Sequence, residues 1–130
     1  AVEVALKMAL QYWFNKGQTD KTKIIALKGA YHGDTFGAMA VGDRGAFTMP
    51  FAKHLFNVEY IDFPAAGYEQ QALSQLREKL ATRDIAAFIY EPLIQAAGGM
   101  RMYSAQVLDE MMQICHEHDA LCIADEVFTG

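Results

Sequence analysis

Apolar and polar positions follow two different spacings along this chain, and the two spacings alternate. Short apolar runs bounded by polar or turn-forming residues are typical of strands. Such runs occur at residues 22–27, 58–63, 85–90 and 121–124. The run at 58–63 alternates, whereas the run at 85–90 is almost wholly apolar, as in a strand covered on both faces. We therefore expect four strands, and we expect the last of them to be buried.

Three longer segments repeat apolar residues at helical spacing, at residues 1–15, 68–81 and 104–118. Ser104 stands at a position where its side chain can cap a helix, and Gly17 is a natural helix stop. Helices that alternate with strands over short links imply right-handed crossovers and a mostly parallel sheet, so the predicted fold class is α/β. The predicted apolar faces consist of Val2, Leu6, Ala9, Leu10 and Trp13, then Leu73, Leu76 and Leu80, then Val107, Leu108, Met111, Met112 and Cys115.

Composition narrows the possible classes of protein. The chain has 130 residues, about one domain, and 52% of them are hydrophobic, which is enough for a core. The net charge is −5 and the 11 basic residues are scattered, so we expect no nucleic-acid partner. No apolar run approaches the roughly 20 residues that a membrane span needs, so we expect no membrane partner. Glu3 and Lys7 interrupt the start, which argues against a signal peptide. Cys115 and Cys122 stand among apolar residues, and we favour buried free thiols in a reducing cytosol over the alternative, a disulfide.

Three segments with unusual residues follow predicted strands, at 29–35, 91–100 and 125–127. The carboxyl ends of parallel strands share one edge of a sheet, where open α/β sheets bind ligands. The first segment places Tyr31, which offers a flat face and a hydroxyl, beside His32 and between glycines that allow close approach. The alternative for this segment is a tight turn in which both side chains merely pack. The second segment begins with Glu91, for which an ordinary solvated strand exit is the alternative.

The third segment, Asp125-Glu126-Val127, allows two chemical uses of the aspartate. Asp125 could hold Mg²⁺ beside a nucleotide, as in P-loop ATPases, but the required phosphate-loop pattern does not occur in this sequence. Asp125 could instead pair with a protonated heterocyclic nitrogen. Pyridoxal phosphate needs a carboxylate at its ring nitrogen, an aromatic on one face and a branched aliphatic side chain on the other. Asp125, Tyr31 and Val127 supply those three types, so we favour pyridoxal phosphate over the ATPase alternative, and we expect no metal.

The three segments resemble motifs of the class III (ω-) aminotransferases, pyridoxal-phosphate enzymes of fold type I. The resemblance covers essentially the whole chain and rests on AYHGDTFGAM at 30–39, EPLIQAAGGMR at 91–101 and IADEVFTG at 123–130. Residues 34–39 and 98–101 carry the more specific likeness, which is to the biotin-pathway branch of the family. The resemblance implies that residues 1–130 form a segment of the large, pyridoxal-phosphate-binding domain, with flanking helices on a mostly parallel sheet.

The resemblance also implies a role for each matching residue in the cofactor site. Asp125 would bind the pyridine nitrogen, Tyr31 would stack on the ring, and Val127 would pack on the other face of the ring. Glu91 would belong to the hydrogen-bond network behind the cofactor. His32 would support the loop within the cofactor site and would not transfer protons.

For substrates, the resemblance implies that Asp34 and Tyr31 face the substrate pocket. The complete enzyme would transfer an amino group from S-adenosylmethionine to 8-amino-7-oxononanoate as a cytoplasmic homodimer. Ornithine- and 4-aminobutyrate-type relatives are the alternative; they carry a glutamate near Ala97 that handles a substrate carboxylate, and alanine cannot do so. The lysine that forms the family's Schiff base is expected beyond Gly130, with the phosphate loop and small domain also outside residues 1–130. We therefore expect no turnover from this chain alone.

Overall fold

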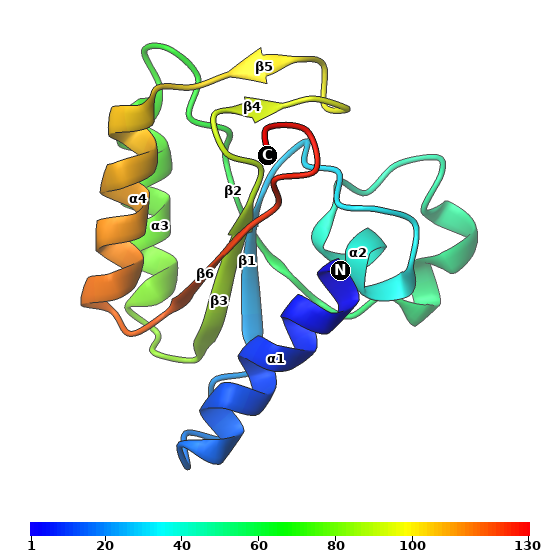
Figure 1. The fold of residues 1–130 in the computed structure, drawn as a ribbon, viewed down its shortest axis with the longest axis vertical. Coiled ribbons are helices and arrows are strands. Elements are labelled where there is room, and N and C mark those ends of the chain that lie inside the picture. The colour runs from blue at the N-terminus through cyan, green and yellow to red at the C-terminus, as the bar shows by residue number, and fades with distance from the viewer.

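The computed structural model of the chain describes residues 1–130 and centres on a parallel sheet (Figure 1). The four strands of the sheet lie in the order β2-β1-β3-β6. A separate antiparallel hairpin pairs β4 with β5. The helices are α1 (Val2–Asn15), α2 (Phe36–Val41), the 3₁₀ helix η1 (Met49–His54), α3 (Glu69–Leu80) and α4 (Ala105–Glu117), and the strands are β1 (Lys23–Leu27), β2 (Glu59–Ile61), β3 (Ile85–Tyr90), β4 (Ile94–Gln95), β5 (Arg101–Met102) and β6 (Leu121–Ala124).

Helices cover both faces of this sheet, α3 and α4 on one side and α1 and α2 on the other (Figure 1). Successive side chains of a strand point to opposite faces, so β1 contributes Ile25 and Leu27 to the core under α3 and α4, and Ile24 and Ala26 to the core under α1. All six residues of β3 are buried, because β3 lies inside the sheet and is covered on both faces. Trp13 fixes α1 to this strand region by donating its indole N–H to the Ala86 carbonyl at 2.8 Å.

The predicted α/β class, the four strands and the three longer helices are confirmed, with small differences at their ends. Ser104 caps α4 as predicted, since its hydroxyl oxygen accepts a hydrogen bond from the Val107 N–H at 3.2 Å. The sequence did not predict α2, η1 or the β4–β5 hairpin. Leu10 and Met112, which the spacing places on the apolar faces of α1 and α4, are 37% and 41% exposed in this chain.

The last strand differs from its prediction, because β6 is an edge strand of this chain rather than a buried one. It pairs only with β3, and its four residues are intermediate or exposed. The burial predicted for Cys122 is therefore wrong, whereas Cys115 is buried; both thiols are free. None of the helices has the length and apolar character that crossing a membrane requires.

Candidate functional site

Three loops meet at the carboxyl edge of the sheet, where β1, β3 and β6 end. We call the segment that follows each strand its exit. The β1 exit carries Tyr31, His32 and Asp34, the β3 exit carries Glu91, and the β6 exit carries Asp125. Figure 1 shows the ends of these three strands beside the β4–β5 hairpin. Parallel pairing brings the three exits together, although their residues are far apart in sequence.

Asp125 and His32 form a buried polar pair at this edge. The Asp125 N–H donates to the Tyr90 carbonyl at 2.8 Å, which extends the pairing of β6 with β3 by one residue. Asp125 Oδ2 lies 2.8 Å from His32 Nδ1, and the two side chains are 10% and 0% exposed. A proton on His32 Nδ1 therefore makes a hydrogen bond that fixes the orientation of the carboxylate. His32 Nε2 is buried without a hydrogen-bond partner.

The second carboxylate oxygen of Asp125 is less engaged. Oδ1 accepts only the Val127 N–H, at 3.3 Å. Val127 is 94% exposed. The structure thus brings Val127 next to Asp125 through its backbone, and it leaves the side chain open toward solvent.

Glu91 joins the β1 exit to the β3 exit. It is buried, and its Oε1 accepts the Tyr31 N–H at 3.1 Å while its Oε2 accepts the Ala96 N–H at 3.1 Å. Its own carbonyl accepts the Tyr103 hydroxyl at 2.7 Å. The solvated strand exit that was the alternative for Glu91 is therefore wrong, because both carboxylate oxygens satisfy backbone donors.

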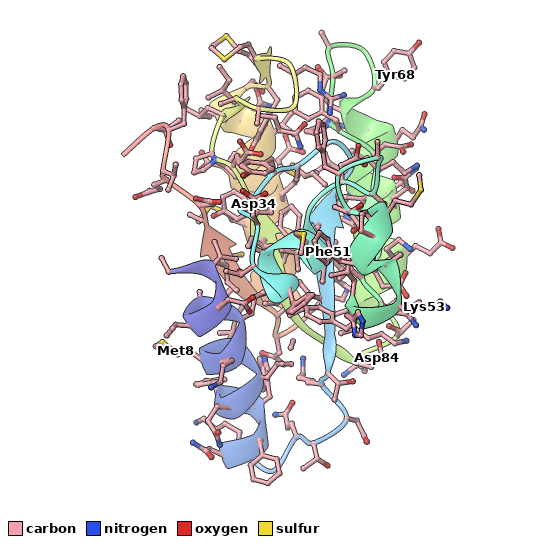
Figure 2. All side chains as sticks on the ribbon, turned by 90° about the vertical axis from the view of Figure 1, so that its right-hand side faces the viewer. Met8, Asp34, Phe51, Lys53, Tyr68 and Asp84 are labelled. Atoms are coloured by element: carbon pink, nitrogen blue, oxygen red, sulfur yellow. The ribbon has the colours of Figure 1, made fainter.

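Tyr31 presents its ring to solvent while its backbone is held by Glu91. Tyr31 is half-exposed, with 48% of the residue accessible to solvent. Its hydroxyl donates to Asp34 Oδ2 at 2.9 Å, and this hydrogen bond raises the pKa of the Tyr31 phenol. Asp34 lies on the loop between β1 and α2 (Figure 2). An anchored backbone with a free aromatic face is suited to stacking on a flat ligand.

The β4–β5 hairpin packs closely against the β1 exit through its own polar contacts. The Lys28 carbonyl accepts hydrogen bonds from Gln95 Nε2 at 3.2 Å and from Arg101 Nη2 at 3.0 Å. A Cβ on Gly98 would lie 2.3 Å from the Gly29 carbonyl oxygen, so only glycine fits between the two loops. The guanidinium of Arg101 also lies over the Phe63 ring, 4.4 Å from its centroid.

A cavity of about 1030 Å³ opens between these loops and the segment after α2. Tyr31 and Asp34 line it together with glycines of the hairpin and Arg101. His32, Glu91, Asp125 and Val127 do not line it. The predicted residues therefore divide into those facing the cavity and those forming the polar network at the strand ends, and Tyr31 belongs to both groups.

Sequence reasoning missed one polar contact that positions this region. Glu3 of α1 accepts the Gly37 N–H at 2.6 Å, at the start of α2, and its pKa is lowered by a hydrogen bond from Thr35 and then by backbone donors. The only sequence signal was a carboxylate on the first turn of a helix, which normally belongs to that helix's own end.

Comparison with known proteins shows to which family this arrangement belongs. The family model described as aminotransferase class III matches residues 1–130, the whole chain. The chain belongs to the class III aminotransferase family. The resemblance seen in the three motifs is thereby confirmed at the level of the family.

Similar proteins agree with the family assignment. The adenosylmethionine-8-amino-7-oxononanoate aminotransferase of Synechococcus elongatus is 49% identical over 100% of this chain and 32% of its own length. The enzyme of the same name from Mycobacterium leprae is 36% identical over 100% of this chain and 30% of its own length. The chain thus spans about a third of the length of the curated relatives that it matches.

Solved structures confirm the fold of this class III aminotransferase chain. The adenosylmethionine-8-amino-7-oxononanoate aminotransferase of Methanocaldococcus jannaschii has a TM-score of 0.89 at 35% identity, covering 99% of this chain and 29% of its own. A pyridoxal-phosphate-bound amine transaminase from an uncultivated Pseudomonas species has a TM-score of 0.92 at 34% identity, covering 100% of this chain and 32% of its own. The predicted sheet with flanking helices is therefore the fold of known transaminases.

Proposed function

We propose that residues 1–130 are a segment of the cofactor-binding large domain of a pyridoxal-phosphate-dependent aminotransferase. The observation that carries the proposal is the Asp125 carboxylate, which is almost fully buried, oriented by His32 and left with an incompletely used oxygen. Such a group fits a protonated heterocyclic nitrogen, because a carboxylate in a partly desolvated position favours the charged form of its partner. The exposed ring of Tyr31 and the exposed side chain of Val127 fit the two faces of a flat heterocycle.

Pyridoxal phosphate supplies an electron sink, since its protonated pyridine ring accepts the electron pair left when a proton is removed from an amine substrate. In our proposal Asp125 holds the proton on the pyridine nitrogen, and His32 keeps the carboxylate directed at it. Glu91 fixes the backbone of Tyr31, so that the phenol ring stacks in one orientation. Asp34 holds the Tyr31 hydroxyl at the border of the cavity, on the side proposed for substrate.

We further propose that the complete protein transfers an amino group from S-adenosylmethionine to 8-amino-7-oxononanoate, as a homodimer in the cytoplasm. The names of the relatives from several organisms support these substrates. Ala97 supports them too, because the cavity there lacks the carboxylate that ornithine- and 4-aminobutyrate-type relatives carry for a substrate carboxylate. The lysine that binds the cofactor covalently is proposed to lie outside residues 1–130.

The full-length protein, reconstituted with pyridoxal phosphate, tests this proposal. We expect formation of 7,8-diaminononanoate with S-adenosylmethionine as donor, and little product with ornithine or 4-aminobutyrate. Asp125→Asn should abolish turnover, whereas Asp109→Asn, at an exposed position of α4, should leave it unchanged. Full turnover in Asp125→Asn would refute the role of Asp125. Efficient use of ornithine or 4-aminobutyrate as the donor would refute the substrate assignment alone.

A further inference from the structure

The segment between β1 and α2 that borders the cavity is held at both of its ends by carboxylates from other elements. We call residues 31–36 of this segment the cavity loop. At its start, Glu91 of the β3 exit accepts the Tyr31 N–H at 3.1 Å. Just after its end, Glu3 of α1 accepts the Gly37 N–H at 2.6 Å, in the first turn of α2. Figure 1 shows the start of α1 beside α2.

The contact with Glu3 replaces a cap that α2 does not have locally. The first N–H groups of a helix have no partner inside the helix, so they need an acceptor from elsewhere. Thr35 precedes α2, but its side chain makes no hydrogen bond to the first turn of the helix. Glu3 supplies this acceptor from α1. Its helix is held in place by the core, because Leu6 on its next turn lies in the same buried cluster as Val41 of α2.

Gly37 leaves the space that the Glu3 carboxylate occupies. A Cβ on Gly37 would have both carboxylate oxygens of Glu3 within 3.0 Å of it. The φ of Gly37 does not lie in the left-handed region, so the backbone itself does not require glycine here. Glycine is unfavourable inside a helix relative to alanine. The contact with Glu3 therefore gives a physical reason for glycine at this position.

The two halves of the cavity loop are held by different groups. In the first half, the His32 side chain is fully buried, and its Nδ1 lies 2.8 Å from Asp125 Oδ2. In the second half, Asp34 lines the cavity and accepts the Tyr31 hydroxyl at 2.9 Å. Glu3 holds the end of this second half. Loss of the Glu3 carboxylate should therefore loosen Asp34 and leave the pair of His32 and Asp125 in place.

We propose that Glu3 is a positioning residue for the aminotransferase reaction, which acts on the substrate through the cavity loop. This inference rests on the proposed function, since it takes the cavity as the place where the amine substrate binds. The apparent affinity for a ligand falls with the fraction of molecules in the binding-competent arrangement. A loop that is released at one end spends less time in that arrangement. Because Asp125 is unaffected, Glu3 should govern KM more than kcat.

Steady-state kinetics of the full-length protein test this role. In Glu3→Ala we expect KM for S-adenosylmethionine to rise about tenfold and kcat to change less than about twofold, since a hydrogen bond to a charged group contributes roughly a power of ten or more to an equilibrium constant. Glu3→Gln keeps an oxygen that can accept the Gly37 N–H, so its KM should lie between those of Glu3→Ala and the wild type. Glu69→Ala is the matched control, because Glu69 is also a partly buried glutamate in the first turn of a helix. An unchanged KM in Glu3→Ala, or an equal rise in Glu69→Ala, would overturn the proposal.

Gly37→Ala breaks the same contact without altering Glu3. The added Cβ overlaps the far end of a side chain that can rotate away, so we expect the variant to fold with the carboxylate displaced. KM should again rise about tenfold. Two changes that remove one shared contact are not additive, so the double variant should also show a rise of about tenfold. A rise of about a hundredfold in the double variant would mean that the two residues act separately, and it would overturn the proposal.

Amide hydrogen exchange of the full-length protein without substrate tests the contact independently of turnover. We expect residues 33–41 to exchange faster in Glu3→Ala than in the wild type and in Glu69→Ala, because the Gly37 N–H has lost its acceptor. Unchanged exchange in Glu3→Ala would overturn the inference. A wild type that shows this difference from Glu3→Ala but has no aminotransferase turnover would instead refute the proposed function. Normal wild-type turnover with unchanged KM in Glu3→Ala would overturn the role of Glu3 alone.

Discussion

Gly98→Ala tests whether the β4–β5 hairpin and the β1 exit must lie as close as they do for the site to work. The added Cβ would stand 2.3 Å from the Gly29 carbonyl oxygen, whereas ordinary contact begins at 3.4 Å. The two loops must therefore move apart by 1.1 Å, the difference between these distances. Because the obstructing atom belongs to the backbone, no side-chain rotation can relieve the contact.

This displacement has two measurable consequences in the full-length protein. Overpacking of this kind costs about 1–3 kcal/mol, so the thermal midpoint should fall. Tyr31 lies two residues after Gly29, and a shift of about 1 Å at a positioned group can cost roughly 10²-fold in rate. We therefore expect kcat/KM of the aminotransferase reaction to fall by about 10²-fold, with weaker retention of pyridoxal phosphate.

Gly45→Ala is the matched control for this experiment. Gly45 borders the same cavity, but a Cβ there would meet no heavy atom within 4 Å, and its φ does not lie in the left-handed region. Gly45→Ala should keep both the thermal midpoint and kcat/KM. If Gly98→Ala instead matched the wild type in both measurements, the close packing of hairpin and β1 exit would have no role in the site.

Two further predictions concern polar groups. The salt-bridged hydrogen bond from Lys28, followed by two glutamine donors, lowers the pKa of Asp62 from 3.8 to about 2. The ionised Asp62 carboxylate stabilises the fold above pH 3.8, and this stabilisation is lost as the pH falls toward 2. The thermal midpoints of the wild type and Asp62→Asn should therefore converge over that interval. A constant difference between the two midpoints would contradict the lowered pKa. In Glu91→Gln the side-chain NH₂ replaces one acceptor oxygen, so the N–H of either Tyr31 or Ala96 loses its acceptor. The thermal midpoint should therefore fall by the equivalent of ~1–3 kcal/mol. An unchanged midpoint would contradict the role of Glu91 in joining the two exits.

The parts of this fold that the sequence could predict are those with a strong local pattern. The strand β3 has six consecutive buried residues and reads as apolar throughout, and the predicted bounds match the observed ones. By contrast, α2 has the sequence FGAMAV with five of six residues buried, so it has no polar face to reveal a helical period. The strands β4 and β5 have two residues each, which is too short for any periodic signal.

The candidate site shows the same division between local and distant information. The residue types at the strand ends could be predicted, because a buried strand followed by a carboxylate is visible in the sequence. Which groups pair could not be predicted: His32 and Asp125 are 93 positions apart, and Tyr31 and Glu91 are 60 apart. Only the order of strands in the sheet decides these pairs. The exposure of Cys122 likewise depends on β6 lying at the edge of this chain's sheet.

The protonation state of the pyridine nitrogen tests the proposed role of Asp125 most directly. Full-length protein loaded with ¹⁵N-labelled pyridoxal phosphate would give a nitrogen NMR shift that distinguishes the protonated ring from the neutral one. We predict a protonated nitrogen at neutral pH in the wild type and in Asp109→Asn, and a neutral nitrogen in Asp125→Asn. A nitrogen that is neutral in the wild type, or equally protonated in Asp125→Asn, would contradict the account.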